Sequence, residues 1–241
     1  MIPLPSRAMV LAAGLGLRLR PLTLDRPKAL VEVGGQTLIE RTLDRLAADG
    51  IKLAVVNLHY KGTLLRRALA SRKAPQIVFS DEAGALLDTG GGILKALPQL
   101  GDEPFFAVNC DIVWRDAQEN SLHRLAQGFD PGAMDALLLM QPTITAIGYD
   151  GMGDFNLDPL GRLTRRDLRE VAPFVFTGVQ LLHPHLFAGA APGCFSLNRL
   201  YDQAATEGRL FGLVHEGDWI DVGTPAGLAA AEAHLAPRRR E

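Results

Sequence analysis

The sequence has little surplus charge, few aromatic side chains and only two cysteines. Its 241 residues carry 25 Lys and Arg against 27 Asp and Glu, a formal net charge of −2, and 6% of them are aromatic. A chain without a basic surplus has no electrostatic footprint for nucleic acid, so we expect no nucleic-acid partner. Cys110 and Cys194 lack the spacing of a metal site, and two unpaired thiols favour a cytoplasmic location.

Long hydrophobic runs are also missing. The apolar stretch near the N-terminus is interrupted at Gly14 and Gly16, which leaves it too short to span a bilayer and unlike a signal peptide. We therefore expect no membrane partner. The basic run Arg238–Arg240 is interpreted as a solvated tail. Nothing in the composition predicts an oligomeric state.

Apolar segments of strand character alternate with segments of helical spacing. We expect strands over 9–12, 53–58, 77–79, 105–108, 136–140, 154–157, 160–164, 174–182, 210–214 and 219–222. Helices are expected over 38–48, 64–69, 92–97 (ended by Pro98), 122–126, 197–205 (capped by Ser196) and 225–235 (capped by Thr224). This order predicts an α/β fold with a mostly parallel sheet that is covered on both faces.

Two glycines follow the first expected strand, in Met-Val-Leu-Ala-Ala-Gly-Leu-Gly-Leu-Arg over residues 9–18. Glycine lets the backbone turn tightly and approach a ligand closely, and successive N–H groups of such a loop can face an anion. Arg18 and Lys28 add two cations. Leu19 stands where a dinucleotide fingerprint needs its third glycine, and the Gly-Lys-Ser/Thr of a P-loop is absent. The pattern therefore predicts a loop that handles a nucleoside triphosphate.

Further segments agree with this loop. Pro-Leu-Thr stands at 21–23 and Pro-Lys-Ala-Leu-Val at 27–31, and later segments are Asn109–Asp111, Phe176–Gly178 and Trp219–Thr224. Together they resemble, over nearly the whole chain, the signature of the sugar-1-phosphate nucleotidyltransferases, which make nucleotide-diphosphate sugars. The resemblance implies a Rossmann-like three-layer sandwich with a mostly parallel mixed sheet. It implies one domain over 1–241, in which residues about 1–115 bind nucleotide and about 116–235 bind the sugar and complete the metal site.

The short chain, the segment Asp88–Ile93 and Gly153-Asp-Phe155 are most similar to members that use UTP and N-acetylmuramate 1-phosphate in bacterial peptidoglycan recycling. Guanylyltransferases of mannose or heptose 1-phosphate remain the alternative. A noncatalytic nucleotide-sugar sensor and a glycosyltransferase of similar fold also stay open. The glycosyltransferase is disfavoured because Asp111-Ile-Val113 lacks the second acid of an Asp-X-Asp metal motif.

Several polar residues follow expected strands. Ligands of open α/β sheets bind outside the carboxyl ends of the strands, so Gly14, Asp81, Asp111 and Asp221 are candidates for one cleft. Mg²⁺ prefers hard oxygen ligands and is often held by one or two carboxylates plus substrate phosphates. Asp111 and Asp221 are the expected Mg²⁺ ligands, as the resemblance also implies.

The remaining expectations concern the two substrates, a nucleoside triphosphate and a sugar 1-phosphate. We expect nucleotide binding by Ala12, Ala13, Gly14, Gly16, Arg18, Lys28 and Gly91. The expected catalytic residues are Arg18, Lys28 and Asp111, and the expected sugar-binding residues are Asn109, Asp154 and Gly178. Arg165 and Arg166 are either partners for the carboxylate of muramate or a solvated pair.

Overall fold

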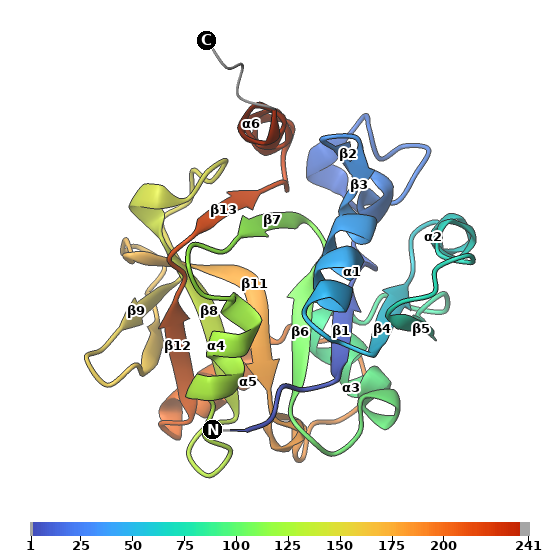
Figure 1. The fold of residues 1–241 in the computed structure, drawn as a ribbon. Helices are drawn as coiled ribbons and strands as arrows, with labels where there is room; N and C mark the ends of the chain where they lie inside the picture. The colour runs from blue at the N-terminus through green and yellow to red at the C-terminus, as the bar shows by residue number, and fades with distance from the viewer. Residues whose placement is uncertain (1, 237–241) are drawn as a thin grey trace.

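A computed structural model of the chain describes residues 2–236. One nine-stranded sheet runs through it (Figure 1). Its strands are β1 (Arg7–Leu11), β4 (Leu53–Leu58), β5 (Gln76–Asp81), β6 (Phe105–Asn109), β8 (Ala136–Pro142), β9 (Phe155–Leu157), β10 (Leu163–Arg165), β11 (Phe174–Leu182) and β12 (Leu210–Val214). The order is β10-β9-β11-β6-β1-β4-β5, and β8 pairs with both β11 and β12. Only β10 and β11 run against the other strands, so the expected mostly parallel mixed sheet is confirmed.

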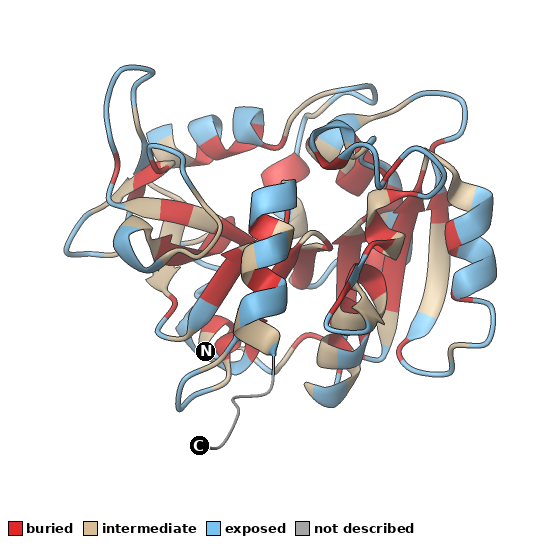
Figure 2. Cartoon of the chain, turned by 90° about the horizontal axis from the view of Figure 1, so that it is seen from above, coloured by how far each residue is buried: buried red, intermediate tan, exposed pale blue. Residues whose placement is uncertain are grey.

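Helices cover both faces of this sheet. The core on one face holds α1 (Leu38–Ala48), α2 (Gly62–Ala68) and α4 (Ser121–Gly128), and the core on the other holds α3 (Asp88–Leu100) and α5 (Asn198–Thr206). Buried strands lie between helices whose outer sides are exposed (Figure 2). Short 3-10 turns complete the layers: η1 (Leu17–Leu19), η2 (Lys28–Leu30), η3 (Thr143–Thr145) and η4 (Pro184–Phe187). The three-layer α/β sandwich is thus the observed architecture.

A separate two-stranded ribbon crosses above the carboxyl edge of the sheet (Figure 1). It consists of β7 (Ile112–Arg115) and β13 (Asp218–Asp221), paired antiparallel, and α6 (Pro225–Leu235) packs on β13. The small hairpin of β2 (Glu32–Val33) and β3 (Gln36–Thr37) lies against the same helix. Apolar side chains, among them Val113, Ile220 and Ala231, form a third core between the ribbon and α6.

Helix ends follow local chemistry. Thr37 caps α1 in a capping box with Glu40, and Thr224 caps α6 as expected, with Pro225 in its first turn. The α3 prediction was wrong at both ends: the helix already begins at Asp88 and continues past Pro98 to Leu100. Proline removes one helical hydrogen bond but leaves the neighbouring bonds in place, so a last turn still forms.

Two smaller expectations also need correction. Ser196 is not the residue that directly precedes α5, because Leu197 takes that position and the Ser196 hydroxyl accepts from the Asn198 N–H at 3.3 Å. The strand expected from residue 160 begins only at Leu163, because Gly161, with φ of 82°, belongs to the preceding turn.

Both cysteines are free, Cys110 buried and Cys194 exposed. Among the described residues, no helix combines the length and the apolar composition that crossing a bilayer requires. The basic run Arg238–Arg240 lies outside the described residues.

Candidate active site

Two cavities meet at the carboxyl edge of the sheet. The main cavity, about 210 Å³, is lined by Ala12, Ala13, Gly14, Lys28, Asn57, Asp88, Thr89, Asn109, Asp111 and neighbouring apolar groups. A second cavity, about 360 Å³ and here called the loop cavity, is lined by residues 14–18, Lys28, Asp111 and Gly223. Gly14, Lys28 and Asp111 line both cavities, so these residues stand at the junction.

The buried side chain of Asn57 fixes the start of the glycine loop. Its Oδ1 accepts the backbone N–H groups of Ala12 at 2.7 Å and Ala13 at 3.2 Å, and its Nδ2 donates to Glu82 Oε1 at 2.8 Å. The two alanines line the main cavity, but their N–H groups are already used. The N–H groups of residues 14–18 make none of the hydrogen bonds found within residues 2–236. The part of the loop that can face an anion therefore begins at Gly14.

Gly16 is required for the shape of this loop. Its φ is 64°, and an added Cβ would lie 2.9 Å from Thr23 Cγ2 and 3.1 Å from Lys28 Cβ. Thr23 in turn donates its hydroxyl to the Gly16 carbonyl at 2.8 Å. Because Gly16 has no side chain, the Pro27-Lys28 segment can pack directly against the loop. This packing places the Lys28 ammonium beside Asp111.

The ribbon brings two carboxylates from distant segments together. Asp221 lies opposite Ile112 in the β7–β13 ladder, and Val222 N–H donates to the Asp111 carbonyl at 3.1 Å. Lys28 Nζ forms an ion pair with Asp111 Oδ2. Burial raises the pKa of the Asp221 carboxyl, the Gly223 N–H that donates to its Oδ1 at 2.7 Å opposes the shift, and the Asp111 charge adds to it.

The Arg18 guanidinium also lies near these carboxylates, beside Asp221. A Cβ added to Gly223 would lie 2.7 Å from Arg18 Nη2 and 2.7 Å from Asp221 Oδ1. Glycine at 223 therefore lets the exposed arginine pass close to the ribbon. Two cations, Arg18 and Lys28, therefore lie close to the carboxylate pair.

The carboxylates suit a magnesium ion. Within residues 2–236, no three His, Cys, Asp or Glu side chains gather as a metal-binding group. Asp111 and Asp221 each keep one carboxylate oxygen that makes no hydrogen bond among the described residues. Two carboxylates completed by substrate phosphates and water are a donor set that Mg²⁺ accepts. The residues present therefore fit the expected ion.

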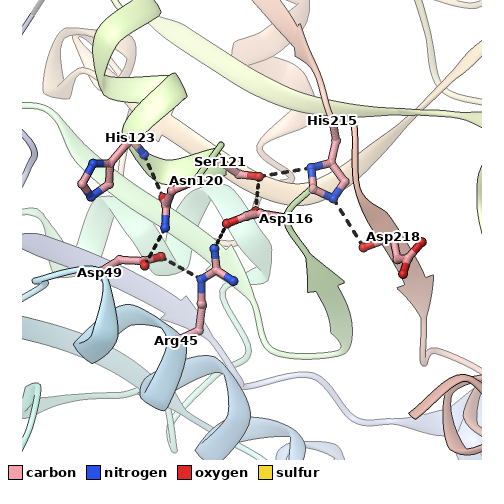
Figure 3. Close-up of polar contacts among 8 residues, drawn as sticks. All are labelled: Arg45, Asp49, Asp116, Asn120, Ser121, His123, His215 and Asp218. Atoms are coloured by element: carbon pink, nitrogen blue, oxygen red, sulfur yellow. Dashed lines mark hydrogen bonds and ion pairs between the residues drawn. The ribbon is translucent and has the colours of Figure 1, made fainter. Parts of the chain in front are cut away.

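A partly buried polar network lies at the far end of the ribbon (Figure 3). Asp116, just after β7, accepts from Arg45 of α1 and from the Ser121 hydroxyl at 2.5 Å. His215 Nδ1 lies 3.1 Å from Ser121 Oγ, and its Nε2 lies 3.4 Å from the carbonyl oxygen of Asp218, where β13 begins. A hydroxyl has one proton, so Ser121 donates to Asp116 and accepts from the imidazole. No local sequence motif predicts this network, because Arg45, Asp116 and His215 are far apart in the sequence.

The expected sugar-binding residues are divided between two places. Asn109 lines the main cavity, and a Cβ at Gly178 would lie 2.9 Å from Asn109 Nδ2, so Gly178 supports this side chain. Asp154 lines a separate cavity of about 290 Å³, here called the side cavity. Burial raises the pKa of the Asp154 carboxyl, against the opposing bond from Phe176 N–H at 2.9 Å.

Two expected positions do not reach the junction. Gly91 is buried in α3, and its N–H donates to the Phe195 carbonyl at 3.2 Å. Asp88 and Thr89 line the main cavity instead, because the first turn of α3 faces it. Asp81 is exposed at the end of β5, where it pairs with Arg66 at 3.5 Å and lines neither cavity.

These features define a class of protein. A loop of unpaired N–H groups, two cations and paired carboxylates lie at the carboxyl edge of a mostly parallel sheet. Such a site has the positive charge and the N–H donors that suit the phosphates of a nucleoside triphosphate. The fold and the site are those of a nucleotidyltransferase.

The chain belongs to the MobA-like NTP transferase domain family, whose pattern matches residues 8–205. It is 44% identical over 236 residues to N-acetylmuramate alpha-1-phosphate uridylyltransferase of Caulobacter vibrioides, covering 96% of this chain and 98% of the relative. The enzyme of the same name from Neisseria meningitidis serogroup B is 34% identical, over 94% and 97%. The inositol-1-phosphate CTP transferase from T. maritima shares the fold, with a TM-score of 0.78 at 17% identity over 98% and 96% of the chains.

Proposed function

We propose that this protein transfers a uridylyl group from UTP to N-acetylmuramate α-1-phosphate and releases pyrophosphate. The observation that carries the proposal is the full-length similarity to two uridylyltransferases of that name, together with the junction of Gly14, Lys28 and Asp111. The proposal treats residues 1–241 as one nucleotidyltransferase domain, with nucleotide bound by about 1–115 and the sugar by about 116–235. It assigns the enzyme to cytoplasmic recycling of peptidoglycan sugars.

In the proposed reaction, a phosphate oxygen of the sugar 1-phosphate attacks the α-phosphorus of UTP. A new phosphorus–oxygen bond forms as the bond to the leaving pyrophosphate breaks, so the products are UDP-N-acetylmuramate and pyrophosphate. The attacking oxygen is already anionic, so no general base is needed. The protein supplies position and positive charge.

The glycine loop and the two cations serve the triphosphate. The N–H groups from Gly14 onward, through Gly16, are assigned to phosphate oxygens, and Arg18 to the leaving pyrophosphate. Ala12 and Ala13 are assigned to packing against the nucleotide rather than to donation, since their N–H groups bond Asn57. The Lys28 side chain is 12% exposed and lies at the junction of the cavities. Its ammonium is assigned to the oxygens of the α-phosphate.

Asp111 and Asp221 are assigned to Mg²⁺. When bound, the ion would neutralise phosphate charge and align the triphosphate. Lys28 pairs with Asp111 and so fixes the orientation of that carboxylate. Asn109, supported by Gly178, is assigned to a sugar hydroxyl at the border of the main cavity, and Asp154 to the sugar from the side cavity.

Pyrophosphate release over a matrix of four nucleoside triphosphates and several sugar 1-phosphates tests the proposal. We expect the highest kcat/KM for UTP with N-acetylmuramate α-1-phosphate, and formation of the UDP-sugar. Preference for GTP with mannose or heptose 1-phosphate would overturn the substrate assignment and leave the reaction class standing. Binding of nucleotide sugars without pyrophosphate release from any pair would instead indicate a sensor.

A further inference from the structure

Two chain segments that line the side cavity are linked to residues of the main cavity. Thr89 lines the main cavity and accepts the Leu197 N–H at 2.9 Å, while the next residue, Asn198, lines the side cavity. In the other segment, Phe176 lines the side cavity two residues before Gly178, which supports Asn109. A sugar bound beside Asn109 can therefore extend a substituent toward the side cavity.

The two arginines of the side cavity differ in how their donors are used. Arg166 Nε donates to the Gly153 carbonyl at 2.6 Å, and its Nη1 donates to the carbonyls of Asp167 at 3.0 Å and Glu170 at 3.1 Å. This guanidinium holds the 167–170 loop to the segment before Asp154. Its position is therefore structural, and a ligand would have to compete with several backbone acceptors.

Asp202 orients the Arg165 guanidinium but accepts from only some of its N–H donors. Arg165 Nε donates to Asp202 Oδ1 at 2.7 Å and its Nη2 donates to the other oxygen of that carboxylate. A guanidinium has five N–H donors, so three of them have no acceptor among the described residues. The two side chains are 44% and 46% exposed, and an exposed ion pair of this kind contributes little to stability because water screens it. A carboxylate ligand can therefore share or displace Asp202.

We propose that Arg165, oriented by Asp202, is the specificity residue that binds the carboxylate of the sugar substrate. The inference rests on the proposed function. N-acetylmuramate differs from N-acetylglucosamine by a lactyl ether on its ring, and that ether carries the carboxylate. Arg165 offers the planar pair of donors that a carboxylate accepts, and Asn198 supplies an amide on the same cavity wall.

The residues lining the side cavity also favour an anion. Its lining carries two guanidinium groups, Arg165 and Arg166, and one carboxylate, Asp154, one oxygen of which is bonded by Phe176 N–H. The carboxylate of Asp202 pairs with Arg165 but is not part of the lining, so the N–H donors of Arg165 that Asp202 leaves free are the ones offered to an anion. A neutral hydroxyl in place of the lactyl group would leave the Arg165 donors to water. The cavity therefore discriminates between sugars by charge.

The test compares two acceptors that differ only in the lactyl group, N-acetylmuramate α-1-phosphate and N-acetyl-α-glucosamine 1-phosphate, each with UTP. For Arg165→Ala and Arg165→Gln we expect kcat/KM with the muramate sugar to fall about 10- to 100-fold, mainly through KM. With the glucosamine sugar the change should stay within about twofold. Arg162→Ala removes an exposed arginine that lines none of these cavities and should leave both values unchanged.

Asp202→Asn should give a smaller loss that is again confined to the muramate sugar, because it disturbs only the orientation of the guanidinium. Equal losses on both sugars, or no loss on either, would overturn the inference while the proposed function stands. Failure of the unmodified enzyme to use the muramate sugar would overturn both. Melting temperatures of all variants show whether an equal loss arises from unfolding.

Discussion

The ammonium of Lys28 is paired with the carboxylate of Asp111, and both side chains line the two cavities that meet at the sheet edge. The two residues are 83 positions apart, and the turn at Gly16 together with the start of β7 brings them into contact. The carboxylate restricts the movement of the ammonium, so in the proposed reaction the charge of Lys28 would be preorganised for the transition state.

Lys28→Ala should lower kcat about 100-fold or more and change nucleotide affinity far less, because the lost charge counts most when charge develops during transfer. Single-turnover rates and calorimetric UTP binding measure the two effects separately. Lys52→Ala, which removes an exposed lysine just before β4, is the matched control. A variant in which only UTP affinity falls would contradict the transition-state role.

Asp111→Asn and Asp221→Asn should each abolish most turnover while the fold persists, since a lost ligand charge costs several kcal/mol of metal-assisted stabilisation. Removing divalent metal with a chelator should stop the unmodified enzyme, and adding Mg²⁺ should restore it. Asp218→Asn changes a carboxylate of the same strand that contacts His234 rather than the junction, and should stay active. Near-normal turnover of Asp111→Asn at limiting Mg²⁺ would refute the assignment of this ligand.

Local signals in the sequence carry much of this organisation. The alternation of strands and helices predicts the layered sheet, and the glycine loop with Lys28 and Asp111 is found at one sheet edge. The sequence does not predict a strand over residues 112–115, because this segment has only four residues and follows the preceding strand after a short turn at 110–111. Their pairing with β13, more than 100 residues later, depends on tertiary structure.

Asn57 illustrates the limit of motif reasoning. A single amide inside a buried apolar strand has no signature, although its bonds to Ala12 and Ala13 decide which N–H groups of the loop remain available. Gly91 shows the converse. A glycine in a ligand loop and a glycine at a crowded helix contact are indistinguishable in the sequence, and only the packed neighbour at Gly193 separates them.

Gly91→Ala should destabilise the protein. Alanine is better than glycine inside a helix by about 1 kcal/mol, but the added Cβ would lie 2.0 Å from the Gly193 carbonyl oxygen. The backbone must then shift, at a cost of about 1–3 kcal/mol or more, so the clash outweighs the propensity. Urea denaturation measures the change. In the control variant Gly84→Ala the added Cβ has no atom within 4 Å, so the free energy of unfolding should not change. A Gly91→Ala variant of unchanged stability that binds UTP poorly would restore the nucleotide-contact interpretation.

Stability should fall as the pH drops below the range where an unfolded histidine titrates, and His215 should be one cause. His215 is 2% exposed, and burial lowers the pKa of its imidazole, with the Arg124 charge acting in the same direction and Asp116 against it. The unfolded chain, with a histidine pKa of about 6.5, binds the proton first, so protons favour unfolding below that pH. Between about pH 6.5 and 5, the free energy of unfolding of His215→Gln should therefore change less steeply with pH than that of the unmodified protein. His123→Gln, which changes an exposed ring beside the same network, is the matched control variant. Urea titrations across this pH range compare the three proteins, and an unaltered slope in His215→Gln would show that other groups carry the acid sensitivity.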